Sequence, residues 1–394
     1  MQNSDWPDLT GKTILQIIPD LAAGGAERTT VEMAEAITGA GGRALVVSSG
    51  GRLEPDLTAA GGTLIRMNGA SKNPLTIRRN ADKLVRLVDE ENVSLLHARS
   101  RAPGWSARIA ALRTDTPFVT TYHGAYSGKS GLKRRYNSVM AKGDLVIANS
   151  AWTADHVHNT HGTPKDKIIT IPRGVDFAAF DPDQIEPDRI TALRKSWNLA
   201  PDDNRLLLVL PGRLTSWKGQ GIAIQALGAL SDEERDRLHL VMPGDSQGRA
   251  RYVSELEDLI LMHKLGGTVS LVGHCLDMPA AYMIGDIILA PSTRPEAFGR
   301  VAAEASAMAK PVIVADHGGQ REIVVDGQTG ARAEPSSTTS LTACIRAMIQ
   351  LPPGSLEAMG QEGQTYVRTR FSKKQLQTAT LHVYSRVLDM PAFA

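Results

Sequence analysis

Two glutamates separated by seven residues give the strongest chemical signal in this sequence. Glu296 lies in the segment Pro-Glu-Ala-Phe-Gly at 295–299, and Glu304 lies in the apolar stretch that follows. If Gly299 opens a helix, the N–H groups of Phe298 and Gly299 can face a phosphate, and Glu304 falls about one and a half turns further along. Carboxylates placed in this way can accept hydrogen bonds from sugar hydroxyls. The pattern favours a sugar-phosphate site over two solvated surface glutamates.

A second signal is a cationic loop with the sequence Pro-Gly-Arg-Leu-Thr-Ser-Trp-Lys-Gly at 211–219, in which Arg213 and Lys218 flank the turn. The loop follows a candidate strand, so both cations belong to the carboxyl edge of a sheet. Two cations there suit a pyrophosphate, whose charge they would neutralise in the ground state and in the leaving group. The alternative is a pair of surface cations beside a glycine turn. We favour the phosphate interpretation.

The first half of the chain has two weaker signals of the same kind. Gly24 and Gly25 stand between a candidate strand and a candidate helix, where a glycine backbone and a helix N-terminus can approach an anion. The segment is not a G-x-G-x-x-G dinucleotide fingerprint, and tight-turn glycines are common at such places. His123 ends another candidate strand and is followed by a glycine, a place that suits an active-site histidine, although a lone histidine is more often structural.

The elements that must position these residues alternate between short β-branched or apolar runs and longer helical stretches, which is typical of βαβ units and of an α/β fold with parallel sheets. A short helix is expected at 189–197. The strands that we predict lie at 13–19, 44–48, 94–97, 118–122, 145–148 and 168–171 in the first half, and at 205–211, 238–243, 269–272, 287–290 and 311–315 in the second.

At 394 residues, two domains are the leading expectation. The polar, proline-bearing stretch near 181–201 separates the two series of strands. We therefore predict two Rossmann-like doubly wound domains at 1–185 and 186–372, followed by a terminal segment at 373–394. Open parallel sheets bind ligands beyond the carboxyl ends of their strands, so two such domains facing each other would form an interdomain cleft.

The motifs together resemble glycosyltransferase family 4, the group 1 glycosyl transferases of GT-B fold. The resemblance covers nearly the whole chain. It rests on Gly-Gly-Ala-Glu at 24–27, Val-Ile-Ala-Asn-Ser at 146–150, Ile-Pro-Arg-Gly-Val-Asp at 171–176, Gly212-Arg213 to Lys218-Gly219, Glu296 to Glu304, Lys-Pro-Val-Ile at 310–313, Gly318-Gly319 to Glu322, and Asp326-Gly327 to Gly330.

The resemblance implies a retaining enzyme that needs no metal and no cofactor beyond its donor substrate, a UDP-sugar or GDP-sugar. It implies an N-terminal acceptor-binding domain, a C-terminal nucleotide-sugar-binding domain, and a terminal helix at 371–388 that crosses back to the first domain. By position, Glu296 would contact the donor sugar, Glu304 the ribose, and His123 the reacting sugar. The pyrophosphate would be held by Arg213, Lys218 and the backbone at Gly24, Gly25, Phe298 and Gly299.

Three positions depart from the family pattern. Arg173 stands where Asn is common, Arg99 replaces the second histidine of a frequent His-x-His, and Met308-Ala309 replaces a frequent Ala-Gly. None of them touches the glutamate pair or the two cations of the loop. These departures bear on which acceptor the protein uses more than on which reaction it catalyses.

Composition limits the remaining possibilities. The 22% charged and 42% hydrophobic residues are ordinary globular values, and no basic and apolar leader or membrane-length apolar run is present. We expect a cytoplasmic protein, and a place on the cytoplasmic face of the inner membrane is an open alternative. Cys275 and Cys344 lack metal-ligand spacing, so no metal site is expected, and no nucleic acid is expected as a partner.

The segment 61–140 is basic, with 14 Lys and Arg against 5 Asp and Glu in a chain whose net charge is +2. Near its end, Lys129, Lys133, Arg134 and Arg135 are interleaved with Leu132, Tyr136, Val139 and Met140, which is typical of a basic amphipathic helix. This pattern predicts that the helix contacts an anionic membrane or a lipid-linked acceptor. The alternative is that the basic side chains form an ordinary solvated surface.

Other functional classes fit less well. A nicotinamide-dependent oxidoreductase would need the G-x-G-x-x-G fingerprint and an acidic residue after the second strand, and the sequence has neither. A catalytically silent nucleotide-sugar-binding subunit and an NDP-sugar epimerase on a related fold remain open. The acceptor that we expect is a lipid-linked glycan or a lipopolysaccharide core in polysaccharide assembly.

Overall fold

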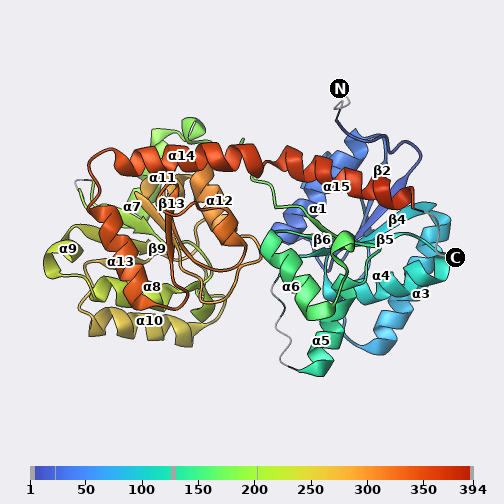
Figure 1. Ribbon diagram of the computed structural model, residues 1–394, viewed down its shortest axis with the longest axis horizontal. Coiled ribbons are helices and arrows are strands. Elements are labelled where there is room, and N and C mark those ends of the chain that lie inside the picture. The colour runs from blue at the N-terminus through green and yellow to red at the C-terminus, as the bar shows by residue number, and fades with distance from the viewer. Residues whose placement is uncertain (1–4, 23, 125, 127–129, 202, 391–394) are drawn as a thin grey trace. The chain divides into compact units, whose positions relative to one another are not determined.

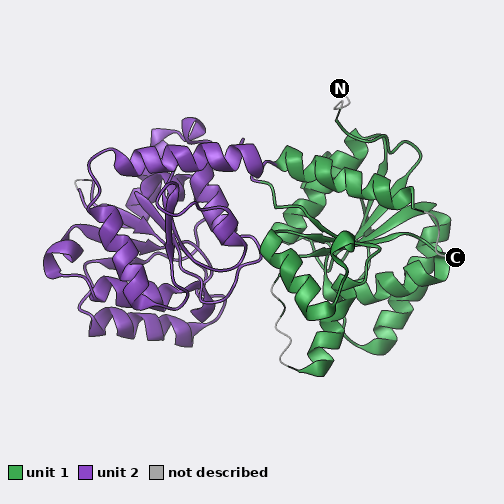
Figure 2. Ribbon diagram, in the orientation of Figure 1, with its two compact units in different colours: residues 1–174, 373–394 green, residues 175–372 purple. Residues whose placement is uncertain are grey.

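The computed structural model describes residues 5–22, 24–124, 126, 130–201 and 203–390 (Figure 1). The chain divides into two compact units, which Figure 2 shows in different colours. Unit 1 consists of residues 1–174 and 373–394, and unit 2 consists of residues 175–372. Each unit is an α/β domain with one parallel sheet.

Unit 1 contains a seven-stranded sheet with the strand order β3-β2-β1-β4-β5-β6-β7. The order reverses between β1 and β4, which pair in parallel. The strands are β1 (Thr13–Ile17), β2 (Arg43–Ser48), β3 (Thr63–Arg66), β4 (Val93–Ala98), β5 (Phe118–Tyr122), β6 (Leu145–Ala148) and β7 (Ile168–Thr170). The helices are α1 (Gly25–Gly39), α2 (Glu54–Ala59), α3 (Pro74–Glu90), α4 (Arg101–Thr114), α5 (Gly131–Asn137), α6 (Ala151–His161) and α15 (Lys373–Leu388).

Both faces of this sheet are buried, as the apolar runs in the sequence require. In β1, Ile14 belongs to the core cluster that contains residues of α1 and α15, whereas Leu15 belongs to the cluster that contains residues of α3 and α4. Successive strand side chains point to opposite faces, so an uninterrupted apolar strand places one cluster on each side. Helices therefore cover both faces of the sheet.

Unit 2 repeats this architecture with six strands in the order β10-β9-β8-β11-β12-β13. Its order reverses between β8 and β11. The strands are β8 (Leu206–Val209), β9 (Leu238–Met242), β10 (Val269–Leu271), β11 (Ile287–Ala290), β12 (Val312–Ala315) and β13 (Gly330–Ala333). The helices are α7 (Pro187–Ser196), α8 (Gln220–Gly228), α9 (Asp232–Asp236), α10 (Ala250–Met262), α11 (Met278–Ile284), α12 (Arg300–Ala307), α13 (Thr338–Ile349) and α14 (Ser355–Arg370).

The change of unit falls after Gly174, whereas the sequence places the first domain boundary at 185/186. The intervening segment packs on unit 2. The N–H of Val175 donates to the carbonyl of Phe371 at 2.7 Å, and Phe177 and Phe180 pack against the core cluster that contains Val175. The segment contains no strand, so the sequence does not show whether its apolar residues belong to the first or the second domain.

The last helix, α15, belongs to unit 1 although it follows α14 of unit 2 directly in sequence (Figures 1 and 2). It packs on α1, and Leu376, Leu381 and Tyr384 are part of the same core cluster as α1. At the other end of the chain, the indole of Trp6 donates to the hydroxyl of Thr378 at 2.9 Å. The core of unit 1 is therefore built from both ends of the chain.

The structure contains every strand that the sequence predicts, with ends that differ by at most two residues. Two strands, β3 and β13, are missing from the prediction. Strand β3 is short, lies at the sheet edge and is only half buried. Strand β13 has the sequence Gly-Ala-Arg-Ala, which has no β-branched or aromatic residue. The helix predicted at 189–197 is α7.

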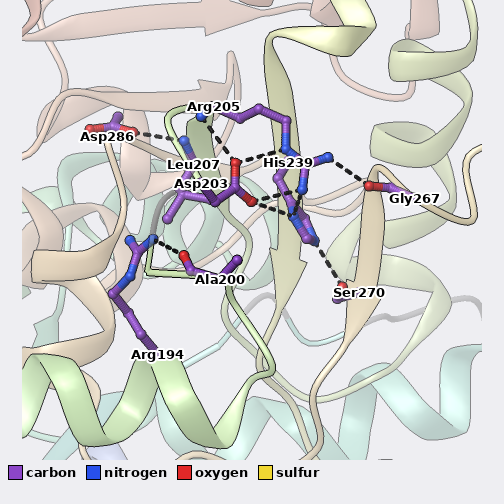
Figure 3. Close-up of polar contacts among 9 residues, drawn as sticks. All are labelled: Arg194, Ala200, Asp203, Arg205, Leu207, His239, Gly267, Ser270 and Asp286. Carbon is purple, nitrogen blue, oxygen red and sulfur yellow. Dashed lines mark hydrogen bonds and ion pairs between the residues drawn. The ribbon is translucent and has the colours of Figure 1, made fainter.

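A polar network joins the amino ends of the strands in unit 2 (Figure 3). The carboxylate of Asp203 accepts from Arg205, and the same guanidinium donates to the carbonyl of Gly267 at 2.6 Å and to Nδ1 of His239 at 2.8 Å. Hydrogen bonds from Arg205 hold the pKa of Asp203 well below its usual range. Polar groups at this edge satisfy one another, which leaves the carboxyl edge for ligands.

The basic amphipathic helix is only partly present. Helix α5 has seven residues, and Val139 and Met140 lie in the 3-10 turn beyond it, fully buried in the core of unit 1. The expectation of a continuous apolar face on this helix is therefore wrong, because these two side chains serve the core. Leu132 is 83% exposed, and Lys133, Arg134 and Arg135 are exposed. Lys129 lies outside the described residues.

Candidate active site

The two strongest sequence motifs meet at the point where the strand order of unit 2 reverses. The loop after β8 carries Lys218, the loop after β11 carries Glu296, and β8 and β11 are neighbours in the sheet. The ammonium Nζ of Lys218 lies 2.9 Å from Oε1 of Glu296. Crevices at such reversals, beyond the carboxyl ends of the strands, are the usual ligand sites of open parallel sheets.

Glu296 is a largely shielded carboxylate, with 12% of its side chain exposed. Its Oε1 accepts a second hydrogen bond from the hydroxyl of Ser292 at 2.5 Å. Burial acts to raise the pKa of Glu296, but the charge of Lys218 and the bonds from Lys218 and Ser292 outweigh burial and hold this pKa below its ordinary value. Glu296 is therefore a charged acceptor at neutral pH, suited to a hydroxyl group of a ligand.

Glycines fix the backbone behind Glu296. The N–H of Gly319 donates to the carbonyl of Glu296 at 2.7 Å. Gly318 has φ +69°, and a Cβ there would come within 2.4 Å of that carbonyl oxygen and 2.7 Å of the amide nitrogen of Glu296. Only glycine combines this left-handed backbone with so close an approach. The Gly-Gly pair in the sequence thus positions the carboxylate without contributing a side chain.

Glu304 lies on α12, where Gly299 is the N-cap residue with φ +106°. The expectation that Gly299 opens a helix is confirmed. Oε1 of Glu304 accepts from Arg300, with Nε at 2.9 Å, and Oε2 accepts from the hydroxyl of Tyr282 at 3.0 Å. Burial raises the pKa of Tyr282 well above its usual value, and Glu304 adds to the rise. Tyr282 therefore stays protonated and donates to the carboxylate.

Arg213 is not part of the Lys218–Glu296 pair. Its side chain is exposed, and its carbonyl accepts a hydrogen bond from the amide of the buried Gln220 at 3.0 Å. Phe298 is buried, with its ring 5.6 Å from that of Phe371, centroid to centroid. Phe298 and Gly299 stand at the start of α12, and the aromatic ring of Phe298 packs in the core.

The remaining predicted residues belong to unit 1. Gly24 is the N-cap residue of α1 and Gly25 is the first residue of that helix. His123 follows β5, and its Nδ1 lies 3.1 Å from a guanidinium nitrogen of Arg173. Burial lowers the pKa of His123 well below its usual value, and the charges of Arg173 and Arg99 add to this effect. The imidazole is therefore neutral at pH 7.

Sequence reasoning missed three residues that shape the site in unit 2. Ser292 and His317 follow β11 and β12, and the imidazole Nε2 of His317 lies 2.7 Å from the carbonyl of Ser292. Trp217 places its ring 4.7 Å from Nζ of Lys218. Their positions in the sequence could have pointed to them. Ser292 and His317 are polar residues just after a strand, and Trp217 stands beside the predicted cation Lys218. Within the described ranges, no group of three His, Cys, Asp or Glu side chains is arranged to hold a metal ion.

Solved structures share the whole architecture. A glycosyltransferase from Rickettsia africae has a TM-score of 0.86 and 32% identity, covering 96% of this chain and 99% of its own. Alr3699/HepE from Anabaena, solved in complex with UDP, has a TM-score of 0.81 and 25% identity, covering 95% of this chain and 100% of its own. The two parallel sheets thus define a GT-B glycosyltransferase, and the chain is an enzyme of this class.

The particular family follows from the sequence. Glycosyltransferase Family 4 matches residues 23–179, and Glycosyl transferases group 1 matches residues 191–366. Together the two models match most of the chain, which therefore belongs to the group 1 glycosyltransferases of family 4. A D-inositol 3-phosphate glycosyltransferase from Xylanimonas cellulosilytica is 29% identical over 310 residues, which span 74% of this chain and 72% of that protein. No helix in the described part of the chain is long and apolar enough to cross a membrane.

Proposed function

We propose that this glycosyltransferase takes its sugar from a uridine diphosphate sugar and transfers it to a hydroxyl group, with retention of configuration and without a metal ion. The observation that carries the proposal is the pairing of Lys218 with Glu296 at the strand reversal of unit 2. The related Alr3699/HepE has been solved with UDP and with UDP-glucose, which favours uridine over the GDP alternative. Envelope polysaccharide or lipopolysaccharide core assembly is the setting that we propose.

Three side chains of unit 2 divide the work of holding the donor. Oε1 of Glu296 is already used twice, by Lys218 and Ser292, so Oε2 is the oxygen that would accept from a sugar hydroxyl. Glu304, at the side of α12, would accept from the ribose hydroxyls. Lys218 would neutralise part of the charge of the diphosphate, and the exposed guanidinium of Arg213 would neutralise another part.

In the transfer step, the bond between the sugar anomeric carbon and the diphosphate oxygen breaks while the acceptor oxygen forms its bond on the same face. The acceptor proton passes to a phosphate oxygen, and nucleoside diphosphate leaves. Lys218 and Arg213 would stabilise the negative charge that grows on the departing oxygens, which is the largest contribution that such a site can make. An inverted anomeric configuration in the NMR spectrum of the product would exclude retention.

Glu304→Gln should weaken UDP binding by about tenfold or more, because a neutral amide accepts ribose hydrogen bonds less strongly than a carboxylate. Isothermal titration calorimetry with UDP, GDP and ADP measures both the loss and the base preference. A specific nucleotide should also raise the Tm of the wild-type protein, since it binds only the native state.

The matched control is Glu257→Gln, an exposed glutamate on α10. It should bind UDP as the wild-type protein does. Equal affinities in the wild type and in Glu304→Gln would remove Glu304 from the donor site. Failure of the wild-type protein to bind any of the three nucleotides would overturn the proposed donor.

For the acceptor we propose a glycan or a lipid-linked glycan, approached from an anionic membrane surface through the basic 61–140 segment. Support within the described residues comes from exposed Leu132 and from Lys133, Arg134 and Arg135 on α5. Co-sedimentation with vesicles should increase with the fraction of anionic lipid and fall with salt. Sedimentation independent of lipid charge would contradict membrane binding and leave a free glycan as the acceptor.

Product analysis separates the other activities. A catalytically silent binding subunit would bind UDP-sugar and release no UDP, and an epimerase would convert the sugar while it stays attached to UDP. Transfer instead releases one UDP for each acceptor glycosylated. The intact Lys218–Glu296 pair favours an enzyme that turns over its donor rather than a catalytically silent binding subunit.

A further inference from the structure

Three basic side chains gather at the carboxyl edge of the sheet in unit 1. Arg99 directly follows β4, His123 directly follows β5, and Arg173 lies beyond β7. The guanidinium of Arg173 is 3.1 Å from the imidazole of His123. The charges of Arg173 and Arg99 both lower the pKa of His123, after burial, so each arginine lies within electrostatic range of His123. Neither arginine follows the family pattern at its position.

Arg99 is only 2% exposed, and its contacts are to neutral groups. Its Nε donates to Oε1 of Gln16 at 2.7 Å, and its charge acts, after burial, on the pKa of the neutral Tyr384 hydroxyl. Its Nη2 is buried and has no hydrogen-bond partner in the described part of the chain. A buried charge without a carboxylate partner is costly, and a buried donor without an acceptor adds to that cost. Such a group is suited to bind an oxyanion.

The contrast with Arg205 in unit 2 shows what a purely structural arginine looks like. There the guanidinium is paired with Asp203 and also donates to a backbone carbonyl (Figure 3). Arg99 is more deeply buried and forms no ion pair with a described residue. Burial lowers the pKa of Arg99, and Tyr384 and, more weakly, the carboxylate of Glu32 on α1 oppose this shift.

Supporting contacts fix Arg99 in place. Gln16, which accepts from Arg99, donates to the carbonyl of Thr30 at 3.0 Å. The hydroxyl of Tyr384 lies 2.6 Å from Nδ1 of His97. The opposite nitrogen of His97 lies 2.7 Å from the hydroxyl of Thr121. These neutral partners position the guanidinium and leave its charge available.

His123 adds a second buried donor at the same edge of the sheet. Because an arginine can only donate, Nδ1 of His123 must be the acceptor of the bond from Arg173, which puts the ring hydrogen on Nε2. Nε2 is shielded from solvent and has no hydrogen-bond partner among the described residues. The cluster therefore presents two kinds of unsatisfied donor, at Nη2 of Arg99 and at Nε2 of His123.

We propose that Arg99, Arg173 and His123 bind a phosphate monoester group carried by the acceptor, so that the enzyme selects a phosphorylated acceptor over its neutral counterpart. Two guanidinium charges match the dianion, and guanidinium groups suit phosphate oxygens. A neutral hydroxyl acceptor would leave the charge of Arg99 uncompensated. This inference rests on the proposed transfer to a hydroxyl acceptor and names the chemical class of that acceptor.

Pairs of acceptors that differ only in the phosphate group test this proposal. Transfer from UDP-glucose to inositol 3-phosphate is compared with transfer to inositol, and transfer to glucose 6-phosphate with transfer to glucose. Binding of inorganic phosphate is measured separately by calorimetric titration. The wild type should favour the phosphorylated member of at least one pair by more than a hundredfold in kcat/KM. Arg99→Gln should lose most of that preference and bind phosphate at least tenfold more weakly, while its affinity for UDP stays unchanged.

Further variants keep the test decisive. Arg99→Lys retains the charge and should recover part of the preference. Arg173→Gln, at a half-buried position, covers the case in which Arg99→Gln does not fold. Arg113→Gln, an exposed cation at the far end of α4, should behave as the wild type.

The outcomes separate the alternatives. Equal loss of UDP and phosphate affinity in Arg99→Gln would assign the cluster to the donor and overturn the proposal. Preference for glucuronate over both phosphorylated and neutral sugars would overturn it in favour of a carboxylate. Wild-type activity with phosphatidylinositol phosphate vesicles but not with soluble inositol phosphate would support it with a lipid source. UDP-sugar binding without any preference for phosphate would refute this inference alone, whereas absence of UDP binding would refute the proposed donor.

Discussion

Lys218→Met is expected to lower turnover by about two to three orders of magnitude, because removal of one preorganised donor to a departing oxyanion typically costs about 3–4 kcal/mol in the transition state. The methionine keeps most of the apolar volume beside Trp217 and removes the charge. Single-turnover kinetics with UDP-glucose and the best acceptor measure the loss. UDP affinity should fall less than turnover, because the charge on the diphosphate grows as the bond breaks.

The same substitution should change the titration of Glu296. Without Lys218, burial becomes the main influence and the pKa of Glu296 should rise. In the wild type this carboxylate stabilises the fold above its unfolded-state pKa, and that contribution is lost as the pH falls through the lower folded-state pKa. In the variant the sign reverses, so the difference in unfolding free energy between the two proteins should grow from acid to neutral pH. Urea titrations at several pH values measure it.

Lys264→Met is the matched control, since this exposed lysine lies just beyond α10. It should leave turnover and the pH dependence of stability unchanged. Turnover of Lys218→Met within a factor of three of the wild type would remove Lys218 from the transition state. An unchanged pH dependence would mean that Lys218 does not set the pKa of Glu296.

Ending the chain after Ser372 should unfold unit 1 and leave unit 2 folded. The truncation removes the α15 side chains that fill the core: Leu376, Leu381, Val383, Tyr384 and Val387. Each buried side chain of this kind contributes about 1.5–3 kcal/mol, so the loss is on the order of 10 kcal/mol, comparable to the whole stability of a typical domain. Unit 2 ends at Ser372 and keeps its own core.

Hydrogen exchange by mass spectrometry reads the two units separately. Strands β1 and β4 should lose protection in the truncated chain, while β8 and β11 should keep it. A chain ending at Leu388 is the control, because it retains all of α15 and should match the full-length protein. Retained protection in β1 after removal of α15 would show that unit 1 folds without its last helix.

Most of the sheet architecture could be predicted from the sequence because its strands are continuous apolar runs that end at turns. Strands 118–122, 145–148 and 287–290 have the predicted ends. The loops carrying Lys218 and Glu296 could also be assigned to a carboxyl edge, since each follows such a run. Strand β13 could not be found, because its pairing with β12 comes from the backbone and its residues have little strand preference.

Side-chain pairing was harder to predict. The sequence suggests Lys218 for phosphate and Glu296 for sugar, and nothing in their separation of 78 residues indicates that they bind each other. Tyr384 lies 287 residues from His97, and only the return of the chain to unit 1 brings them together. The orphaned Nη2 of Arg99 depends on which partners surround it, which spacing along the chain does not encode.

The divided core of unit 1 also has a consequence in time. During synthesis, β1 and α1 leave the ribosome before unit 2, and α15, the helix that covers them, leaves only after the whole of unit 2. At translation rates of about 5–20 residues per second, the delay is on the order of ten seconds or more. Throughout that interval the apolar surface of the nascent sheet of unit 1 is accessible to chaperones and to other nascent chains. Unit 2 is continuous in sequence, so it can finish folding before unit 1 does.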